Sequence, residues 1–171
     1  MADRVVENES AEVPEIPEAL EKVMLFALDE GKAKMSHVDD MLVPFTCLVI
    51  KENMFIESHP GDNAEECFNY AKHTVQGARG AEAYAFCYDG YVETDDGMMD
   101  ALIAEGGVPG VEDGFAVCYL YETDEEGGIT YEDEPAYVGQ APNFMSALKD
   151  AEEYADDEID EKYLEEDEVE L

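Results

Sequence analysis

Four cysteines are the residues of this sequence best suited to bind a metal or to act as nucleophiles. They are Cys47, Cys67, Cys87 and Cys118. Their spacings leave no Cys-x-x-Cys pair of the kind that holds structural zinc. Three lie in apolar stretches, and Cys67 lies on the apolar side of a predicted helix, where a free thiol packs as a small hydrophobic group. We therefore predict four core cysteines, reduced because the sequence shows no export signal.

Three histidines are the next candidates for metal ligands or acid–base groups: His37, His59 and His73. The best cluster places Glu66, Asn69 and His73 on one outer face of a predicted helix, with His59 just before that helix. This cluster matches no His-Glu-x-x-His spacing, and an exposed polar helix face explains it without chemistry. Ser36 and His37 are adjacent, but a catalytic triad is a spatial arrangement, so adjacency indicates nothing.

One acidic loop mimics a calcium site. Its glycine and hydrophobic positions follow an EF-hand loop, with the candidate positions Glu122, Asp124, Glu126, Gly127, Ile129 and Asp133. However, Glu replaces Asp at the first ligand position, and Asp replaces the bidentate Glu at the last. The flanking residues are typical of strands, so we predict a hairpin turn, with weak calcium binding as the alternative.

The sequence contains no other recognisable catalytic or cofactor motif. It has no Gly-x-Gly-x-x-Gly fingerprint, no phosphate-binding loop and no Gly-x-Ser-x-Gly elbow. Close Asp/Glu pairs are expected by chance among 45 acidic residues, so none indicates a hydrolase dyad. We therefore assign no catalytic residue, no cofactor and no metal site.

The net charge of the chain narrows the classes of molecule that it can bind. The 171 residues carry 45 Asp and Glu against 9 Lys and Arg, a net charge of −36, yet 46% of them are hydrophobic. So negative a chain repels nucleic-acid backbones and anionic membranes, and its apolar runs are too short to span a bilayer. The acidity fits a hydrated, soluble exterior, or a surface that recruits a basic protein. We expect a soluble cytoplasmic protein.

Repulsion among the acidic side chains leads to a testable prediction about stability in salt. Excess acidic residues remain in the middle of the chain as well as at its ends, so added salt should screen their repulsion in the folded state. The midpoint of thermal unfolding should therefore rise between low and high ionic strength. A midpoint that stays flat or falls would contradict this expectation.

The elements that must position any site follow from hydrophobic periodicity. Helical spacing predicts a helix from Pro17 to about Lys34 and a second one after Asn63, ending at Gly77–Gly80. Apolar runs separated by turn residues predict six strands, at 45–50, 54–58, 84–92, 98–105, 115–121 and 129–132. A last helix is predicted from Pro142 to about Leu164, with Phe144, Ala147 and Leu148 on its inner side.

Seven tyrosines concentrate in the predicted strand region: Tyr84, Tyr88, Tyr91, Tyr119, Tyr121, Tyr131 and Tyr137. Tyrosine is a good strand former, so the first interpretation is the outer face of a sheet. Tyrosine is also common at protein interfaces, because it combines a large apolar area with a polar tip. An interaction face is therefore the second interpretation.

The predicted fold is α+β, a two-layer sandwich in which helices cover one face of a mainly antiparallel sheet of 5–6 strands. The element order is α-β-β-α-β-β-β(-β)-α. Residues 1–16 are expected to be a flexible acidic leader, 17–164 a single domain and 165–171 a solvated acidic tail. This element order resembles that of roadblock-type (profilin-like) domains and, more loosely, the small acidic chaperones of type III secretion. No motif residue accompanies the resemblance, so it implies no function for this chain.

The leading functional hypothesis is a non-enzymatic domain that binds or regulates another protein. Its expected partner is a basic protein or a second copy of the chain. One alternative is an enzyme or a small-ligand-binding protein whose site is assembled only in space. The other is a nucleic-acid mimic that inhibits a basic protein.

Overall fold

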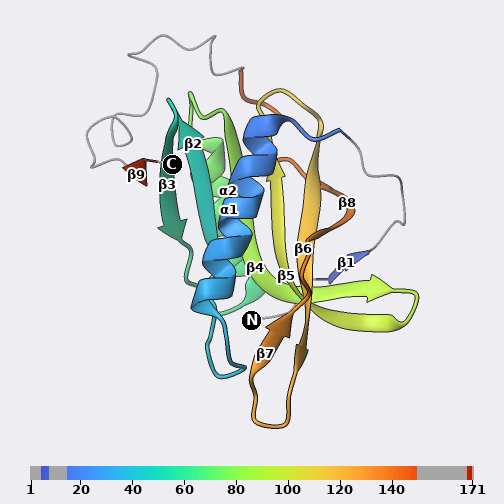
Figure 1. The fold of residues 1–171 in the computed structure, drawn as a ribbon. Helices are drawn as coiled ribbons and strands as arrows, with labels where there is room; N and C mark the ends of the chain where they lie inside the picture. Colours follow the sequence, from blue (N-terminus) through green and yellow to red (C-terminus); the bar gives the residue numbers. More distant parts are fainter. Residues whose placement is uncertain (1–4, 8–14, 150–168, 171) are drawn as a thin grey trace.

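The fold is a large, mainly antiparallel sheet with two helices, seen in a computed structural model that describes residues 5–7, 15–149 and 169–170 (Figure 1). The helices are α1 (Glu18–Lys34) and α2 (Ala64–Gln76). The strands are β1 (Val5–Glu7), β2 (Phe45–Ile50), β3 (Asn53–Ser58), β4 (Ala83–Thr94), β5 (Gly97–Gly107), β6 (Asp113–Thr123), β7 (Ile129–Tyr131), β8 (Ala136–Pro142) and β9 (Val169–Glu170). The α+β class with a mainly antiparallel sheet is confirmed.

The described strands form one nine-stranded sheet in the order β7-β6-β5-β4-β2-β3-β9. Off this path, β8 pairs with β6, and β1 pairs with β4 in parallel. The sheet is larger than the predicted 5–6 strands because β1, β8 and β9 are short or lie in segments without a strand pattern. The segment 98–105, which is ambiguous in sequence, lies within β5.

Hairpins build most of this sheet. The predicted pairing of these two strands is confirmed, and Lys51 and Glu52 between them both have positive φ, the combination that a type I′ turn requires. The β4–β5 hairpin turns at residues 95–96, directly before Gly97, whose φ is 105°. Its tip and that of the β6–β7 hairpin project beyond the helices at one end of the molecule (Figure 1).

The helices lie on opposite faces of the sheet, which differs from the predicted two-layer arrangement. One core cluster joins α1 to Cys47, Ala85 and Leu102, and the other joins α2 to Leu48, Phe86 and Ile103. Figure 1 shows α1 in front of the strands and α2 behind them. The central strands are therefore buried on both faces, and this explains why β2 is apolar at nearly every position.

Side-chain size differs between the two faces. On β4, Ala83, Ala85 and Cys87 face α1, whereas Tyr84, Phe86 and Tyr88 face the α2 side. Small residues let a helix approach closely, and α1 places Gly31 so near β4 that a Cβ added to this glycine would lie 3.0 Å from Cys87 Sγ. The larger rings fill the wider space on the other face.

The predicted last helix is wrong in its described part. Strand β8 continues to Pro142, where the helix was predicted to begin, and residues 144–148 form turns closed by hydrogen bonds such as Leu148 N–H to the Met145 carbonyl, 3.0 Å. Asn143 does not open a helix. Its Nδ2 donates to the carbonyls of Val108 (2.8 Å) and Val111 (2.6 Å), which fixes the end of β8 on the β5–β6 turn. The rest of the predicted helix, 150–164, lies outside the described residues.

Two described strands fall in the predicted leader and tail. β1 pairs with Tyr91–Glu93 of β4, and β9 pairs with Asn53 and Met54 of β3. The other residues of the leader before position 15, and of the tail, lie outside the described residues, so the domain boundaries stay a prediction. Neither α1 nor α2, the helices of the described chain, is long and apolar enough to span a membrane.

Candidate acidic binding hollow

The four cysteines are all buried and free. Burial raises the pKa of the Cys47 and Cys118 thiols to about 12, with a further contribution from Glu30 and Glu132 respectively. Burial and then Glu66 also raise the pKa of Cys67. Thiols held in the neutral form are poor nucleophiles, so the predicted core role of these residues agrees with their position.

The histidine cluster does not assemble. His59 is completely buried, whereas Glu66, Asn69 and His73 are exposed on α2. The Glu66 carboxylate instead accepts the Asp62 N–H at 2.7 Å, and the Glu66 N–H donates to Asn63 Oδ1 at 2.9 Å, an arrangement close to a capping box but with the residue before the N-cap as donor. Within the described ranges, no three His, Cys, Asp or Glu side chains are arranged to hold a metal ion.

Sequence reasoning missed a buried polar network around His59. The Nε2 atom of His59 lies 2.7 Å from Thr46 Oγ1, and its Nδ1 atom lies 3.8 Å from Glu57 Oε2. Glu57 also accepts a hydrogen bond from Thr74 Oγ1 at 2.9 Å. A hydroxyl, an imidazole and a carboxylate in this order resemble an acyl-transfer relay, but Thr46 is 0% exposed, so no substrate can reach its oxygen. The network ties β2, β3 and α2 together.

The loop that mimics a calcium site is a hairpin turn, as predicted. Asp124 Oδ1 accepts the N–H groups of Glu126 (2.9 Å) and Gly128 (2.8 Å), so this carboxylate stabilises the β6–β7 turn itself. His37 holds the turn from outside, with its Nε2 atom 2.8 Å from the Glu126 carbonyl. Asp124 and His37 are thus structural residues of this hairpin.

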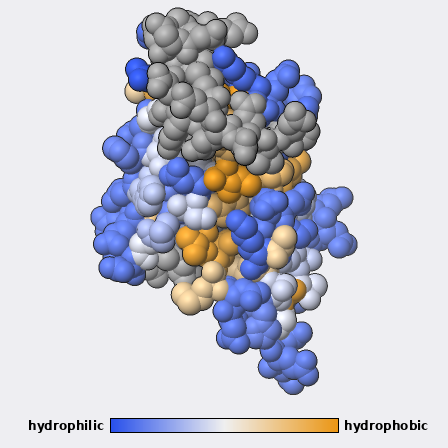
Figure 2. Space-filling model, turned by 90° about the vertical axis from the view of Figure 1, so that its left-hand side faces the viewer, coloured by the Kyte–Doolittle hydropathy of each residue, from blue (hydrophilic) through white to orange (hydrophobic). Residues whose placement is uncertain are grey.

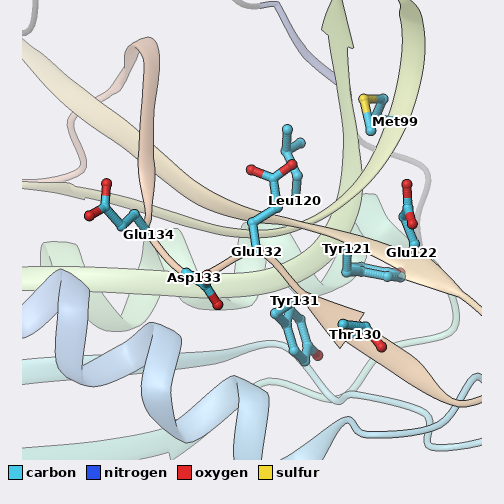
Figure 3. Close-up of a pocket in the computed structure, with 9 residues that line it drawn as sticks. All are labelled: Met99, Leu120, Tyr121, Glu122, Thr130, Tyr131, Glu132, Asp133 and Glu134. Atoms are coloured by element: carbon cyan, nitrogen blue, oxygen red, sulfur yellow. The ribbon is translucent and has the colours of Figure 1, made fainter.

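An acidic hollow of about 650 Å³ lies where the β6–β7 hairpin meets β5. Its nine lining residues are Met99, Leu120, Tyr121, Glu122, Thr130, Tyr131, Glu132, Asp133 and Glu134 (Figure 3). Four of the nine are carboxylates, and none of the nine is basic. Glu122, Glu132, Asp133 and Glu134 are exposed, so the hollow is open to a ligand from solution.

Strand register explains how the lining is arranged. Tyr121 pairs with Tyr131 and Glu122 with Thr130, so Leu120, Glu122, Thr130 and Glu132 share one face of the hairpin. Figure 3 shows Leu120, Glu122 and Glu132 projecting to the same side of the ribbon, the side where Met99 lies. The hollow therefore combines an apolar floor with carboxylates around it.

The two tyrosines on the other face anchor the hairpin. Tyr121 donates to Asp89 Oδ1 at 2.6 Å and Tyr131 donates to the Met35 carbonyl at 2.5 Å. Their rings make an edge contact at 5.5 Å. Burial raises the pKa of both phenols, and for Tyr121 the hydrogen bond to Asp89 adds to this effect. Protonated phenols keep these hydrogen bonds, so the hairpin that carries the hollow is held in place from its other face.

The lining could be found only in part from the sequence. In the sequence, Glu122 and Asp133 stand out as part of a calcium-like loop, and both tyrosines stand out as part of a tyrosine-rich region. No sequence motif marks Met99, Thr130 or Glu134. Most tyrosines do not form an exposed sheet face: Tyr84 and Tyr88 are buried on the α2 side, and Tyr119 and Tyr121 on the α1 side. A sheet covered on both faces places good strand formers in its core.

Comparisons with protein-family models, with curated proteins and with solved structures found no match for this chain. The resemblance in element order to roadblock-type domains therefore gains no support from them. The geometry of the hollow is what remains to indicate a function.

Proposed function

We propose that this protein is a binding domain that recognises a basic segment of a partner protein in the acidic hollow. The observation that carries the proposal is the lining: four carboxylates, an apolar floor of Met99 and Leu120, and no basic residue. A lysine or arginine side chain matches this lining, because it has an apolar stem and a positively charged head. The stem would pack on the floor while the head meets Glu122 and Glu132.

Charge supports the same partner class. The net charge of −36 attracts a basic protein over distances comparable to the Debye length and repels acidic competitors. Carboxylates that accept hydrogen bonds from lysine or arginine then give selectivity at short range. Long-range attraction is common to the whole surface, so a test must separate the hollow from the rest of the acidic exterior.

The test compares two charge-matched double variants. Deca-arginine is titrated by calorimetry at 150 mM salt into the parent protein, into E122Q/E132Q and into E65Q/E112Q. Glu65 and Glu112 are exposed and lie outside the hollow, so the control variant loses the same charge. We expect the hollow variant to bind at least about tenfold more weakly, since charge-assisted hydrogen bonds contribute about 1.5–3 kcal/mol each. The control should change by less than about threefold, as screened surface charges contribute little.

Equal weakening of both variants would contradict the proposal, because it would show attraction to net charge alone. All four substitutions are at exposed positions, so unfolding does not explain a loss of binding. Thermal unfolding of each variant checks this point.

A further inference from the structure

A smaller cavity lies between α1 and the strands β6 and β8 (Figure 1). Its volume is about 250 Å³, and Glu21 is the only charged residue among the eight that line it. The other seven are apolar or aromatic, and they include Met24 and Leu25 of α1, Val117 of β6 and Tyr137 of β8. We call this cavity the apolar pocket.

The apolar pocket has a buried floor and an exposed rim. Met24 and Val117 form the floor, with 1% and 8% of their surface exposed, and both belong to the core on the α1 side. Pro135 and Ala136 are exposed and form part of the rim. The cavity is smaller than sites for drug-sized ligands, which span about 300–1,000 Å³. It therefore suits a single apolar side chain better than a cofactor.

The apolar pocket and the acidic hollow meet at one peptide bond. Glu134 lines the hollow, and Pro135, the next residue, lines the pocket. The Cα atoms of consecutive residues are only about 3.8 Å apart. Burial, then Asp29 of α1 and Glu134, raise the pKa of the Tyr119 phenol, which belongs to the core on the α1 side. The charge of Glu134 therefore acts on the side of the sheet where the pocket lies.

Exposed apolar side chains away from the two cavities give a weaker signal. On the side of the molecule that carries β3, hydrophobic areas lie among hydrophilic residues (Figure 2). Met41, with 82% of its surface exposed, lies on the connection between α1 and β2 and lines neither cavity. Single exposed apolar residues are normal and indicate no partner. A concave apolar site directly beside an acidic one is a more specific feature.

We infer that the apolar pocket is a second subsite for the partner of the hollow, and that it takes one large apolar side chain of the same basic segment. This inference rests on the proposed function and deepens it, because it defines the segment as basic residues with a phenylalanine-like or leucine-like residue close by. The basic residues meet the carboxylates of the hollow, while the apolar side chain leaves water at the floor formed by Met24 and Val117. Two linked contacts bind more tightly than either alone, since the second one forms within the complex.

The test compares two peptides that differ only in their end residues. Both contain deca-arginine, and two glycines at each end link it to a terminal alanine in one peptide and to a terminal phenylalanine in the other. The glycines give either end the freedom to reach the pocket. Each peptide is titrated by calorimetry into the parent protein, A136F and A33F. The larger side chain of A136F would fill the pocket from its rim, whereas Ala33 is an exposed residue of α1 that lines neither cavity.

The parent protein should bind the phenylalanine-ended peptide at least about fivefold more tightly than the alanine-ended one, because burial of an aromatic side chain outweighs the cost of ordering it. In A136F this ratio of affinities should fall below about twofold, whereas A33F should keep it. Ala136 and Ala33 are both exposed, so neither substitution should unfold the protein. Thermal unfolding of both variants checks this point.

A ratio near one in the parent protein, or an unchanged ratio in A136F, would overturn the inference. Equally tight binding of the arginine-free peptide Phe-Gly-Gly-Phe would also overturn it, since the pocket would then be an independent site for small apolar ligands. Self-association that A136F abolishes would assign the pocket to a second copy of the chain instead. The alanine-ended peptide tests the hollow separately. If it binds E122Q/E132Q as tightly as E65Q/E112Q, the proposed function fails and this inference fails with it, whereas failure of the ratio alone leaves the hollow intact.

Discussion

Replacing Gly106 with alanine should destabilise the protein by about 3 kcal/mol or more, since overpacking a filled core costs about 1–3 kcal/mol and a clash with backbone adds to this. Gly106 lies in β5 beneath α1. A Cβ at this position would overlap the Tyr84 carbonyl oxygen and lie 2.8 Å from Leu20 Cδ1 and 3.1 Å from Met24 Cγ. The side chains of α1 have some freedom to shift, but a carbonyl within the β4–β5 pairing does not.

Urea unfolding of G106A measures this effect, with G77A as the matched control. Gly77 follows α2 with φ −86°, and a Cβ there would have only ordinary contacts, the nearest at 3.5 Å. Alanine fits that backbone conformation, so G77A should be as stable as the parent or more stable, by up to about 1 kcal/mol. Equal effects of the two substitutions would show that the close approach of α1 to β5 is not as described.

Replacing Asn143 with alanine should cost about 2–4 kcal/mol, because several hydrogen bonds of about 1 kcal/mol each are lost and buried groups remain unsatisfied. In addition to its two bonds to the β5–β6 turn, Asn143 accepts the buried N–H of Met145 at Oδ1, 2.9 Å. The residue is 7% exposed, so water replaces these partners poorly. The change removes the link between β8 and the β5–β6 turn.

Denaturant unfolding of N143A is compared with that of N69A, which removes an exposed asparagine of α2. N69A should remain within about 0.5 kcal/mol of the parent, as is usual for surface substitutions. A loss of stability in N143A no larger than that in N69A would contradict the structural role of Asn143.

Local patterns predicted most of the fold. Helical spacing between Pro17 and Lys34 predicted α1, and a second helix was predicted after Asn63, where α2 begins. The β2–β3 and β6–β7 hairpins followed from short polar turns between apolar runs. In each case the signal lies within a few residues of the element that it specifies.

Non-local features were not predictable from those patterns. Asn143 looked like a helix start because Pro142 and Asn143 favour that role locally, but its partners Val108 and Val111 lie more than thirty residues earlier. The sequence pattern of β4 also does not show which helix covers which face of the sheet. Alternating Ala and Tyr are apolar on both faces, so the alternation gives no buried side and no exposed side. The apolar floor of the hollow joins Met99 to Leu120 through the β5–β6 arrangement, which no spacing rule describes.

The most direct test of the acidic hollow as a binding site is an NMR titration of the isotope-labelled protein with deca-arginine at 150 mM salt. We expect amide shifts to concentrate at Met99 and in residues 120–134, and to saturate. E122Q/E132Q should lose these shifts while E65Q/E112Q keeps them. Small shifts spread evenly over every acidic surface, or centred away from the β6–β7 hairpin, would contradict binding in the hollow.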